Sequence, residues 1–317
     1  MTTSFPMFLN RFIWLLLVVM AGGSCKKADD AAAPKTITDY IQENNQLSLL
    51  RAAIGHAGLG DALKAANLTI FAPNDAAVQA AGFSSEAAIR ALPKEQVKAL
   101  VLYHVLYAPV STSAIPSGVN SIETASKGIA FLNKTSGGTI YINQAQITQA
   151  DISVANGTLH VIDKVLNPST GSLLTALQGN TSLTLLTAAL KRISSSNTTV
   201  AGILNNTTST NTVTLFAPND AAFQSAGYKD VAAINSANLN TLTNTLLYHV
   251  LSGVTFSNQF QTNSYTTLLS GNKVNVTATS NQVAIKGNKN SGFATIKSAN
   301  MATANGVIHV IDQVLLP

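Results

Sequence analysis

The sequence predicts an α+β fold that is built twice, and three observations lead to this prediction. Three short motifs occur in the same order in each half of the 317-residue chain. In each half, apolar residues first recur at helical spacing and later alternate with other residues, as in half-buried strands. The repeat is longer than that of solenoid proteins, so each copy should be a domain with its own core.

The three motifs define the repeat. Phe-Ala-Pro-Asn-Asp occupies residues 71–75 and 216–220, Tyr-His occupies 103–104 and 248–249, and Asn-Gly-x-x-His occupies 156–160 and 305–309. Residues 47–50 (Leu-Ser-Leu-Leu) align with 183–186 (Leu-Thr-Leu-Leu) at an offset of 136, whereas the first motif repeats at an offset of 145, so the second copy has nine extra residues before its first motif, around 194–212. This segment is rich in Ser, Thr and Asn, which predicts an enlarged surface loop.

Helices are predicted around residues 37–66 and 94–106, where apolar side chains such as Val97 and Val101 recur at helical spacing. Pro93 stands just before the second of these segments, at a position that favours proline. Strands are predicted where two apolar residues flank a third residue: Ile140 and Ile142 around Tyr141, Val274 and Val276 around Asn275, and Val283 and Ile285 around Ala284.

The first motif indicates a junction between a strand and a helix. Residues 69–71 favour a strand, and Pro73 removes a hydrogen-bond donor and ends the ladder. Asn74 or Asp75 can then cap a helix that starts at Ala76. This motif is therefore interpreted as structural rather than catalytic. The Asn-Gly pairs of the third motif predict tight turns that set strand register.

The motifs, in this order and repeated, resemble a tandem pair of fasciclin-1-type domains, fasciclin-like and related to beta-Ig-h3. The resemblance covers nearly everything from residue 36 to residue 317. It implies domains at 36–168 and 173–317, each a twisted β-wedge with packed helices. Such domains are found in secreted and surface-anchored adhesion or matrix proteins.

Residues 1–24 are predicted to be a signal peptide, because Arg11 precedes ten apolar residues, too few to span a bilayer comfortably. The only cysteine, Cys25, follows and resembles the lipidated cysteine of a bacterial lipoprotein, although Gly22 stands where that pattern prefers an aliphatic residue. The charged residues behind it resemble the surface-export signals of Bacteroidetes-like lipoproteins. Residues 25–35 are polar and small, which predicts a flexible tether. The alternative is a secreted protein whose cysteine happens to lie at the cleavage site.

Composition agrees with a secreted binding protein and makes nucleic acid an unlikely partner. Only 10% of the residues are charged, and Ser, Thr, Asn and Gln supply most of the polar surface. No basic run exceeds two residues, which argues against nucleic acid as a partner. The expected partners are a protein or polysaccharide at the cell surface or in the matrix, and the membrane through the lipid on Cys25.

The histidines are predicted to belong to the core. His104 and His249 are equivalent and lie in apolar runs, and His160 and His309 are equivalent and lie in strands. We expect them to bond to the backbone or to a carboxylate rather than to a metal. The chain lacks the Gly-x-Ser-x-Gly and His-Glu-x-x-His signatures, so no catalytic residue, no metal site and no cofactor is predicted.

The candidate binding residues come from the resemblance. In animal fasciclin-like proteins, an Asp-Ile pair ahead of the third motif and the Tyr-His motif are implicated in integrin-dependent adhesion. This implies a protein-binding role for Asp151-Ile152, Tyr103-His104 and Tyr248-His249. The second copy has Asn300-Met301 at the Asp-Ile position, so the first domain is the better candidate. These residues can equally be explained by packing, and a bacterium makes no integrins.

The sequence therefore leaves three hypotheses about function. The leading hypothesis is a non-enzymatic adhesion or binding protein, lipid-anchored in the outer membrane and exposed at the surface. The second is a periplasmic structural or accessory subunit of an outer-membrane receptor or transport complex. The third is a glycan-acting enzyme that uses the pairs Asp75/Asp163 and Asp220/Asp312, which would have to converge within about 5 to 10 Å in an open cleft.

Overall fold

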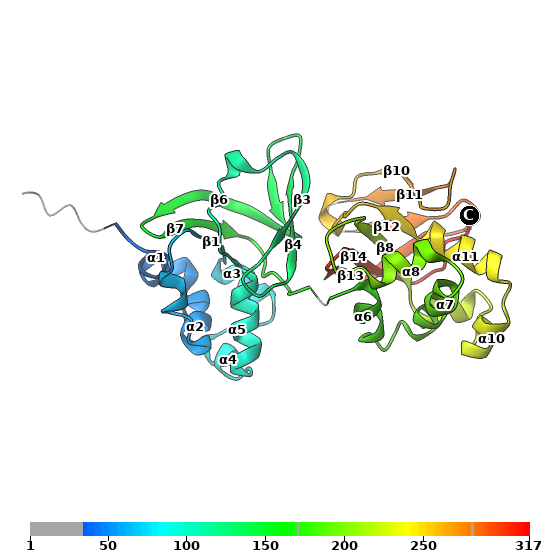
Figure 1. Cartoon of the computed structure of the whole chain (residues 1–317), viewed down its shortest axis with the longest axis horizontal. Helices are drawn as coiled ribbons and strands as arrows, with labels where there is room; N and C mark the ends of the chain where they lie inside the picture. Colours follow the sequence, from blue (N-terminus) through cyan, green and yellow to red (C-terminus); the bar gives the residue numbers. More distant parts are fainter. Residues whose placement is uncertain (1–33, 170, 280–281) are drawn as a thin grey trace, which may run out of the picture. The chain divides into compact units, whose positions relative to one another are not determined.

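The computed structural model describes residues 34–169, 171–279 and 282–317. The predicted signal peptide, the predicted lipidation site Cys25 and most of the tether lie outside the described residues. Within the described part of the chain, no helix is both long and apolar enough to span a membrane. The helices and strands form two domains of matching architecture, which confirms the α+β prediction (Figure 1).

The first domain contains one sheet in the order β2-β1-β7-β6-β5-β4-β3. Its strands are β1 (Leu68–Pro73), β2 (Val105–Leu106), β3 (Gly118–Glu123), β4 (Ile129–Lys134), β5 (Ile140–Ile142), β6 (Ala145–Val154) and β7 (Gly157–Ile162). Its helices are α1 (Ile37–Glu43), η1 (Asn45–Leu47), α2 (Ser48–Ala57), η2 (Ala62–Lys64), α3 (Asp75–Ala80), α4 (Glu86–Arg90), α5 (Lys94–Tyr103) and η3 (Thr112–Ala114). The pair β1–β7 is parallel, and the other pairs are antiparallel.

The second domain repeats this order, as β9-β8-β14-β13-β12-β11-β10. Its strands are β8 (Val213–Pro218), β9 (Val250–Ser252), β10 (Asn263–Thr266), β11 (Lys273–Ala278), β12 (Val283–Lys286), β13 (Ala294–Thr303) and β14 (Gly306–Ile311). Its helices are α6 (Leu173–Gln178), α7 (Thr184–Ser194), α8 (Thr198–Asn205), α9 (Asp220–Ser225), α10 (Val231–Ser236), α11 (Leu239–Tyr248) and η4 (Ser257–Gln259). The parallel pair is again the first and last strand of the domain, β8 and β14.

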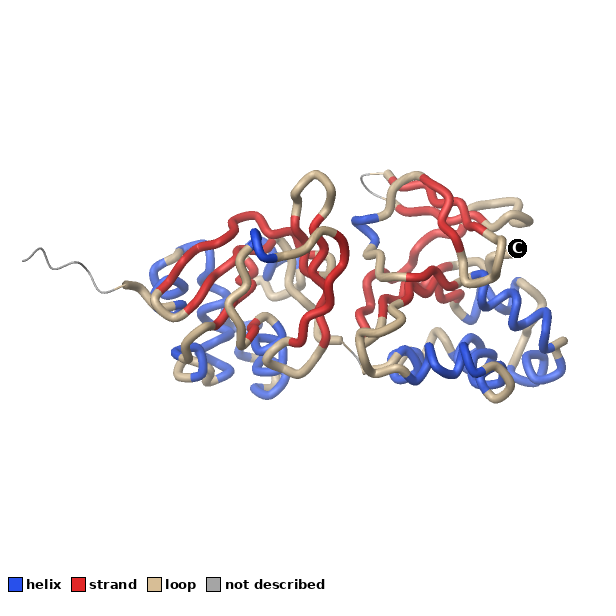
Figure 2. Tube along the Cα trace, turned by 45° about the horizontal axis from the view of Figure 1, so that its top comes forward, coloured by secondary structure: helices blue, strands red, loops and turns tan. Residues whose placement is uncertain are grey.

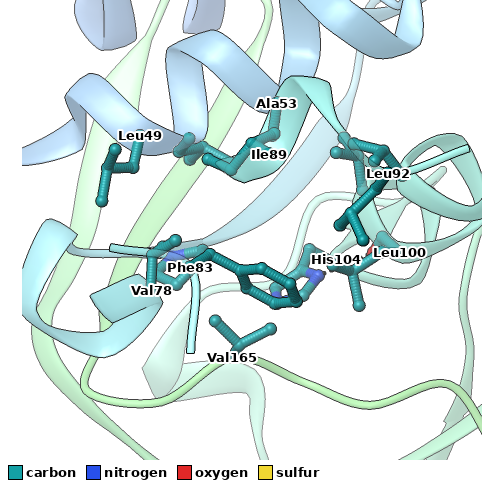
Figure 3. Close-up of a pocket in the computed structure, with 13 residues that line it drawn as sticks. Leu49, Ala53, Val78, Phe83, Ile89, Leu92, Leu100, His104 and Val165 are labelled. Carbon is teal, nitrogen blue, oxygen red and sulfur yellow. Dashed lines mark hydrogen bonds between the residues drawn. The ribbon is translucent and has the colours of Figure 1, made fainter. Parts of the chain in front are cut away.

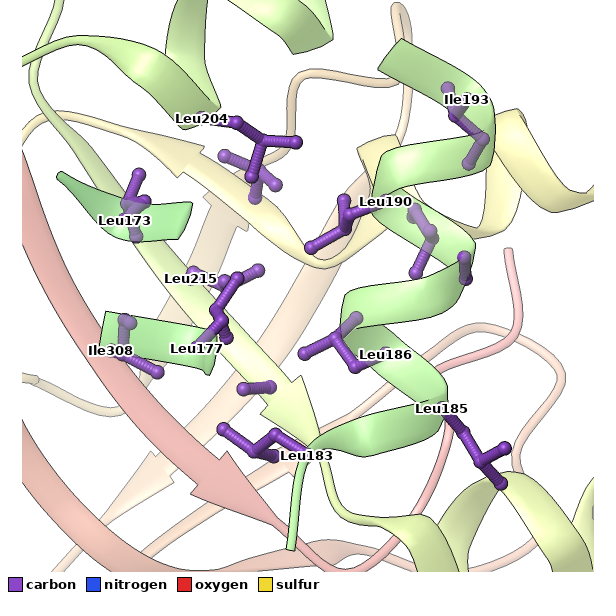
Figure 4. Close-up of a cluster of buried hydrophobic side chains, with 14 of the residues drawn as sticks. Leu173, Leu177, Leu183, Leu185, Leu186, Leu190, Ile193, Leu204, Leu215 and Ile308 are labelled. Carbon is purple, nitrogen blue, oxygen red and sulfur yellow. The ribbon is translucent and has the colours of Figure 1, made fainter. Parts of the chain in front are cut away.

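In each domain the α-helices gather on one side of the strands (Figure 2). The main core lies between these helices and the sheet, and in the second domain it is built largely from leucine. Figure 4 shows Leu177 of α6 and Leu186 and Leu190 of α7 converging with Leu215 of β8 and Ile308 of β14. A second cluster fills the rest of each domain around Phe71 and Phe216, respectively. The alternating strands predicted around residues 141, 275 and 284 are confirmed as β5, β11 and β12.

The glycine of the third motif permits the parallel pairing. The two-residue turn between β6 and β7 is Ala155-Asn156, and Gly157 is already the first residue of β7. A Cβ atom on Gly157 would lie 2.0 Å from the Leu68 carbonyl oxygen of β1, and one on Gly306 would lie 2.2 Å from that of Val213. The predicted turn is therefore present, but the glycine is required by the neighbouring strand rather than by the turn.

Two predicted segments differ in the structure. The second predicted helix ends at Tyr103 rather than Leu106, because Val105 and Leu106 form β2 and pair with β1. The segment predicted as an enlarged loop contains the helix α8. Asn197 caps this helix by accepting a hydrogen bond from the Val200 amide, and Val200 and Leu204 bury one face of it.

Candidate functional site

The polar residues of the first motif hold two helices. The Asn74 Oδ1 atom accepts a hydrogen bond from the Ala77 amide at 2.8 Å and caps α3. The Asp75 carboxylate instead reaches α2, accepting from the Leu49 amide at 2.8 Å and from the Ser48 hydroxyl at 2.6 Å. Asn74, rather than Asp75, is therefore the cap of its own helix, and the structural interpretation of the motif is confirmed.

The second domain repeats these contacts. Asn219 caps α9 through the Ala222 amide at 2.8 Å. The Asp220 carboxylate accepts from the Leu185 amide at 2.8 Å and from the Thr184 hydroxyl at 2.6 Å. The first aspartate of each proposed catalytic pair is thus used to cap a neighbouring helix.

The second aspartate of each pair fixes a strand. The Asp163 carboxylate accepts from the Gln146 amide of β6 at 2.7 Å, and Asp312 accepts from the Thr295 amide of β13 at the same distance. Asp312 also forms an ion pair with Lys297 at 2.9 Å. All four carboxylates therefore have partners within the fold, and their contacts are those of caps and strand ends rather than of an acid–base pair in a cleft.

The tyrosines of the second motif are buried. The Tyr103 hydroxyl donates to the Ile129 carbonyl at 2.7 Å and accepts from the Asn143 side-chain amide at 3.1 Å. Burial raises the pKa of Tyr103 to about 12. The Tyr248 hydroxyl donates to the Lys273 carbonyl at 2.7 Å and accepts from the Asn288 amide at 3.0 Å. Each hydroxyl ties the last turn of a helix to the far part of its sheet.

The histidines of the second motif are buried beside these tyrosines and use both ring nitrogens. The His104 Nδ1 atom donates to the Leu100 carbonyl at 2.8 Å, and its Nε2 atom accepts from the Leu166 amide at 2.9 Å. His249 bonds in the same way to the Thr245 carbonyl at 2.7 Å and the Leu315 amide at 2.8 Å. Burial lowers the pKa of each to about 4, so both rings are neutral at pH 7.

The structure thus places Tyr103, His104, Tyr248 and His249 in the interior, each 2% exposed or less. The prediction that the histidines belong to the core is confirmed. A direct contact of these four residues with a partner protein stays a prediction, and the hydrogen bonds described above give each of them a role within the fold.

Asp151 differs from these residues because it lies on the surface. It stands at an irregularity of β6, with a positive φ of 55°, and is exposed. Its carboxylate accepts from the Thr112 amide at 2.9 Å and from the Thr112 hydroxyl, at the start of η3. Burial tends to raise its pKa, but the hydrogen bonds from Thr112 outweigh this and hold the pKa below its ordinary value. Ile152 is half-buried against the helix-side core, so only the aspartate of the pair offers a polar surface group.

Asn300 takes the place of Asp151 in the second domain and makes the corresponding contacts. Its φ is 65°, its Oδ1 atom accepts from the Ser257 amide at 2.7 Å, and its Nδ2 atom donates to the Ser257 hydroxyl at 2.7 Å. The backbone amides of Asp151 and Asn300 donate to His160 Nδ1 at 3.1 Å and His309 Nδ1 at 3.3 Å, respectively. The structural role of this position is therefore common to both domains, and the negative charge is particular to the first.

Sequence reasoning missed an apolar cavity in the first domain. It has a volume of about 40 Å³, and Figure 3 shows Leu49, Val78, Ile89 and Leu100, from four different helices, around it. Comparison of the two copies could have indicated it, because the first domain has the smaller residue, Val78, where the second has Phe223. Phe223 is fully buried, with its ring 5.9 Å from that of Tyr228.

Sequence reasoning also missed an open groove in the second domain. It is bordered by α8, the segment 206–212 and Ser252, and has a volume of about 660 Å³. Among the residues that the structure describes, no three His, Cys, Asp or Glu side chains are grouped so that they could hold a metal ion.

Comparisons with known proteins agree on one family. The family model of the fasciclin domain matches residues 45–168 and 182–317. Protein sll1483 of Synechocystis is 33% identical over 136 residues, which are 42% of this chain and 73% of that protein. Immunogenic protein MPT70 of Mycobacterium tuberculosis is 31% identical over 142 residues, 45% of this chain and 67% of MPT70.

Longer relatives are matched only in part. Human periostin is 26% identical over 187 residues, which are 59% of this chain and 21% of periostin. The solved structure of a FAS1 domain pair from the insect cell adhesion molecule fasciclin I aligns over 85% of this chain and 96% of its own, with 18% sequence identity and a TM-score of 0.40.

Proposed function

Because this chain belongs to the fasciclin domain family, we propose that it is a non-enzymatic adhesion or binding protein of the bacterial cell envelope. A lipid on Cys25 anchors it in the outer membrane, and its two domains face the outside of the cell. The single cysteine directly behind an apolar N-terminal segment supports the anchor. Fasciclin domains are typical of adhesion and binding proteins, which supports the activity.

One observation carries the non-enzymatic part of the proposal. The aspartates and histidines of the three motifs are hydrogen-bonded to helix ends and strands of their own domain, in the same way in both copies. A catalytic acid or nucleophile needs an accessible side chain, whereas these groups hold the fold. Binding then depends on the shape and chemistry of surfaces that surround a rigid framework.

Exposure of the two domains at the cell surface is tested by trypsin digestion of intact cells, followed by blotting. Cells that express the wild-type protein are compared with cells that express Cys25→Ala. We expect the wild-type band to disappear while a periplasmic marker protein stays intact. We expect Cys25→Ala to leave the membrane fraction, since it cannot be acylated. Protection of the wild-type band until the outer membrane is permeabilised would refute surface exposure and favour a periplasmic accessory subunit.

The candidate contact at Asp151 is tested with a substitution that spares the fold. Asn300 shows that asparagine can make the hydrogen bonds of this position at a positive φ. Asp151→Asn therefore removes the charge and keeps the framework. If Asp151 contacts a partner, this variant should reduce attachment of cells to matrix-coated surfaces, and the reverse change Asn300→Asp in the second domain serves as the matched control. Unchanged attachment would remove Asp151 from the binding surface.

A further inference from the structure

The open groove of the second domain is lined by hydroxyl and amide side chains. The polar groups come from both ends of α8, from the segment that follows it and from the end of β9: Thr198, Thr199, Asn205, Asn211, Thr212 and Ser252. Its volume of about 660 Å³ is within the usual range for ligand pockets. The groove is open to solvent, so a ligand could enter without a rearrangement of the core.

The lining carries no charge. None of the residues that border the groove is Asp, Glu, Lys, Arg or His. A phosphate or carboxylate ligand would lack a cation to pair with, and a cationic ligand would lack an acid. The hydroxyls of Thr198, Thr199, Thr212 and Ser252 make no hydrogen bond to other described residues, so they are available both to donate and to accept. Such a surface suits a neutral ligand rich in hydroxyl groups.

Apolar side chains provide the other half of the recognition. Ile203 and Leu268 are half-buried at the groove, and Val213 is buried beneath it. A sugar ring presents C–H groups as well as hydroxyls, so it can pack on these side chains while it bonds to the threonines and asparagines. The ligand with both properties is a neutral oligosaccharide.

The groove is made by the insertion that distinguishes the second domain. In the first domain, the Asn156 side chain donates to the Leu63 carbonyl of η2 at 2.8 Å, and in the second the Asn305 side chain donates to the Ile203 carbonyl of α8 at 3.0 Å. By this shared hydrogen bond, the short helix η2 stands where the second domain has α8. The first domain also has an ion pair at this place, Lys64 with Asp61 at 2.8 Å.

The segment after α8 is held by its own side chains. The Asn206 Oδ1 atom accepts from the Thr208 amide at 2.8 Å and from the Thr208 hydroxyl at 2.7 Å, and the Asn206 Nδ2 atom donates to the Thr210 carbonyl. A rim that is already ordered loses less conformational entropy when a ligand binds. From the lining, the absence of charge in it and this ordered rim, we propose that the groove between α8 and Ser252 binds a neutral oligosaccharide. This inference rests on the proposed binding function and names its ligand class.

The test uses the purified chain with a glycine in the groove changed to a large residue. A Cβ atom on Gly202 of α8 meets no atom within 4 Å, so Gly202→Trp can fill the groove without displacing the helix. Gly55 of α2, exposed and equally free of neighbours, gives the matched control Gly55→Trp in the first domain. A second variant, Thr198→Val with Thr199→Val, removes two hydroxyls with little change of shape.

Binding is followed by NMR through the methyl groups of Ile203 and Leu268 during titration with maltohexaose, cellohexaose and mannohexaose. Hexagalacturonate serves as the acidic counterpart, and a Ser/Thr-rich peptide as the protein counterpart. We expect at least one neutral hexasaccharide to shift both methyl signals in wild type and in Gly55→Trp. We expect at least ten-fold weaker binding in Gly202→Trp and in the double threonine variant.

Three results would overturn the inference. They are an absence of shifts with every neutral oligosaccharide, tighter binding of hexagalacturonate or of the peptide, and equal binding by wild type and the folded double threonine variant. None of these results bears on intact-cell digestion or on attachment through Asp151. Failure of the oligosaccharide inference can therefore be distinguished from failure of the proposed adhesion function.

Discussion

Acid should destabilise both domains through the buried histidines of the second motif. His104 and His249 are neutral in the folded protein, because each Nε2 atom must accept a hydrogen bond from a backbone amide. Their pKa is about 4 when folded, against an ordinary value of 6.5. Below pH 6.5 the unfolded chain therefore binds protons that the folded chain does not, and stability falls as the pH falls towards 4.

The magnitude follows from the difference between the two pKa values. At pH 5, each histidine should lower the free energy of unfolding by about 2 kcal/mol, and at pH 4 by about 3 kcal/mol. Above pH 7 the contribution is fully present and no longer varies. The window of instability is therefore pH 4 to 6.5, and each domain carries one such histidine in its second motif.

Hydrogen exchange of the Leu166 and Leu315 amides measures this effect in each domain separately, since these amides donate to His104 and His249. Exchange is corrected for its intrinsic pH dependence and compared at pH 8 and pH 5. We expect the protection of both amides to fall by at least roughly 30-fold, since the titration of His104 or His249 alone contributes about 2 kcal/mol. The variant His104→Gln keeps a donor for Leu100 and an acceptor for Leu166 but cannot titrate.

In His104→Gln, the factor by which Leu166 protection falls between pH 8 and pH 5 should be roughly 30-fold smaller than in wild type. Protection of Leu315 should fall as in wild type, and this amide serves as the control within the same molecule. His160 and His309, whose pKa values burial also lowers, add to the slope of their domains in both proteins. The reasoning is refuted if Leu166 protection in wild type is constant from pH 8 to 5. It is equally refuted if His104→Gln keeps the full pH dependence.

Three further predictions concern the framework. Gly157→Ala should lower the free energy of unfolding by roughly 3 kcal/mol, because the new methyl group would lie 2.0 Å from the Leu68 carbonyl oxygen. Gly55→Ala, on the open surface of a helix, should raise it by about 1 kcal/mol. Thermal unfolding of the two variants measures both changes. Asp151→Asn should change the free energy of unfolding by less than about 0.5 kcal/mol, and Asp151→Ala should lower it by about 1 kcal/mol. Similar denaturation midpoints for the two variants would contradict a stabilising hydrogen bond from Thr112 to this side chain. Val78→Phe should overpack the cavity of the first domain and lower the free energy of unfolding by about 1–3 kcal/mol. Leu92 also lines this cavity, and the second domain has Ala237 at its position. Adding Leu92→Ala to Val78→Phe should therefore recover at least about 1 kcal/mol, as measured in a double-mutant cycle.

The sequence predicted those contacts whose two partners are close along the chain. Asn74 caps the helix that follows it by accepting from an amide only three residues later, so the motif alone indicated a cap. Asp75 caps a helix whose first turn lies 26 residues earlier, and His104 bonds to an amide 62 residues later. No local pattern specifies such partners, because they are brought together only by packing of the helices against the sheet.

The local pattern predicted the surroundings of the candidate binding residues to different degrees. The apolar run around Tyr103-His104 predicted burial, and both residues are buried, whereas Asp151 lies on the surface. The protein contact that the family resemblance implied for these residues stays a prediction. The helix α8 could have been predicted more closely, since Asn197 precedes Val200 and Leu204 at helical spacing.

Comparison of the two copies indicates where function should be sought. His56 has no histidine counterpart, yet Arg192 stands at its position, and the two side chains bond to equivalent carbonyls: His56 Nε2 to Leu92 at 2.9 Å and Arg192 Nη2 to Ala237 at 2.8 Å. Asp151 and Asn300 likewise differ in charge but make the same contacts. A bond that survives a change of residue type is one that the fold itself requires.

Features that serve the fold should therefore be present in both domains, and features that serve a partner need not be. The carboxylate of Asp151 belongs to the first domain alone, and the uncharged groove beside α8 is built from the segment inserted in the second. The Asp151 carboxylate and the groove side chains of Thr198, Thr199 and Ser252 are exposed, so these polar groups are not part of a core. If the protein binds through its domains, these two surfaces give each domain a different specificity on the same framework, and substitutions in one should leave binding at the other unchanged.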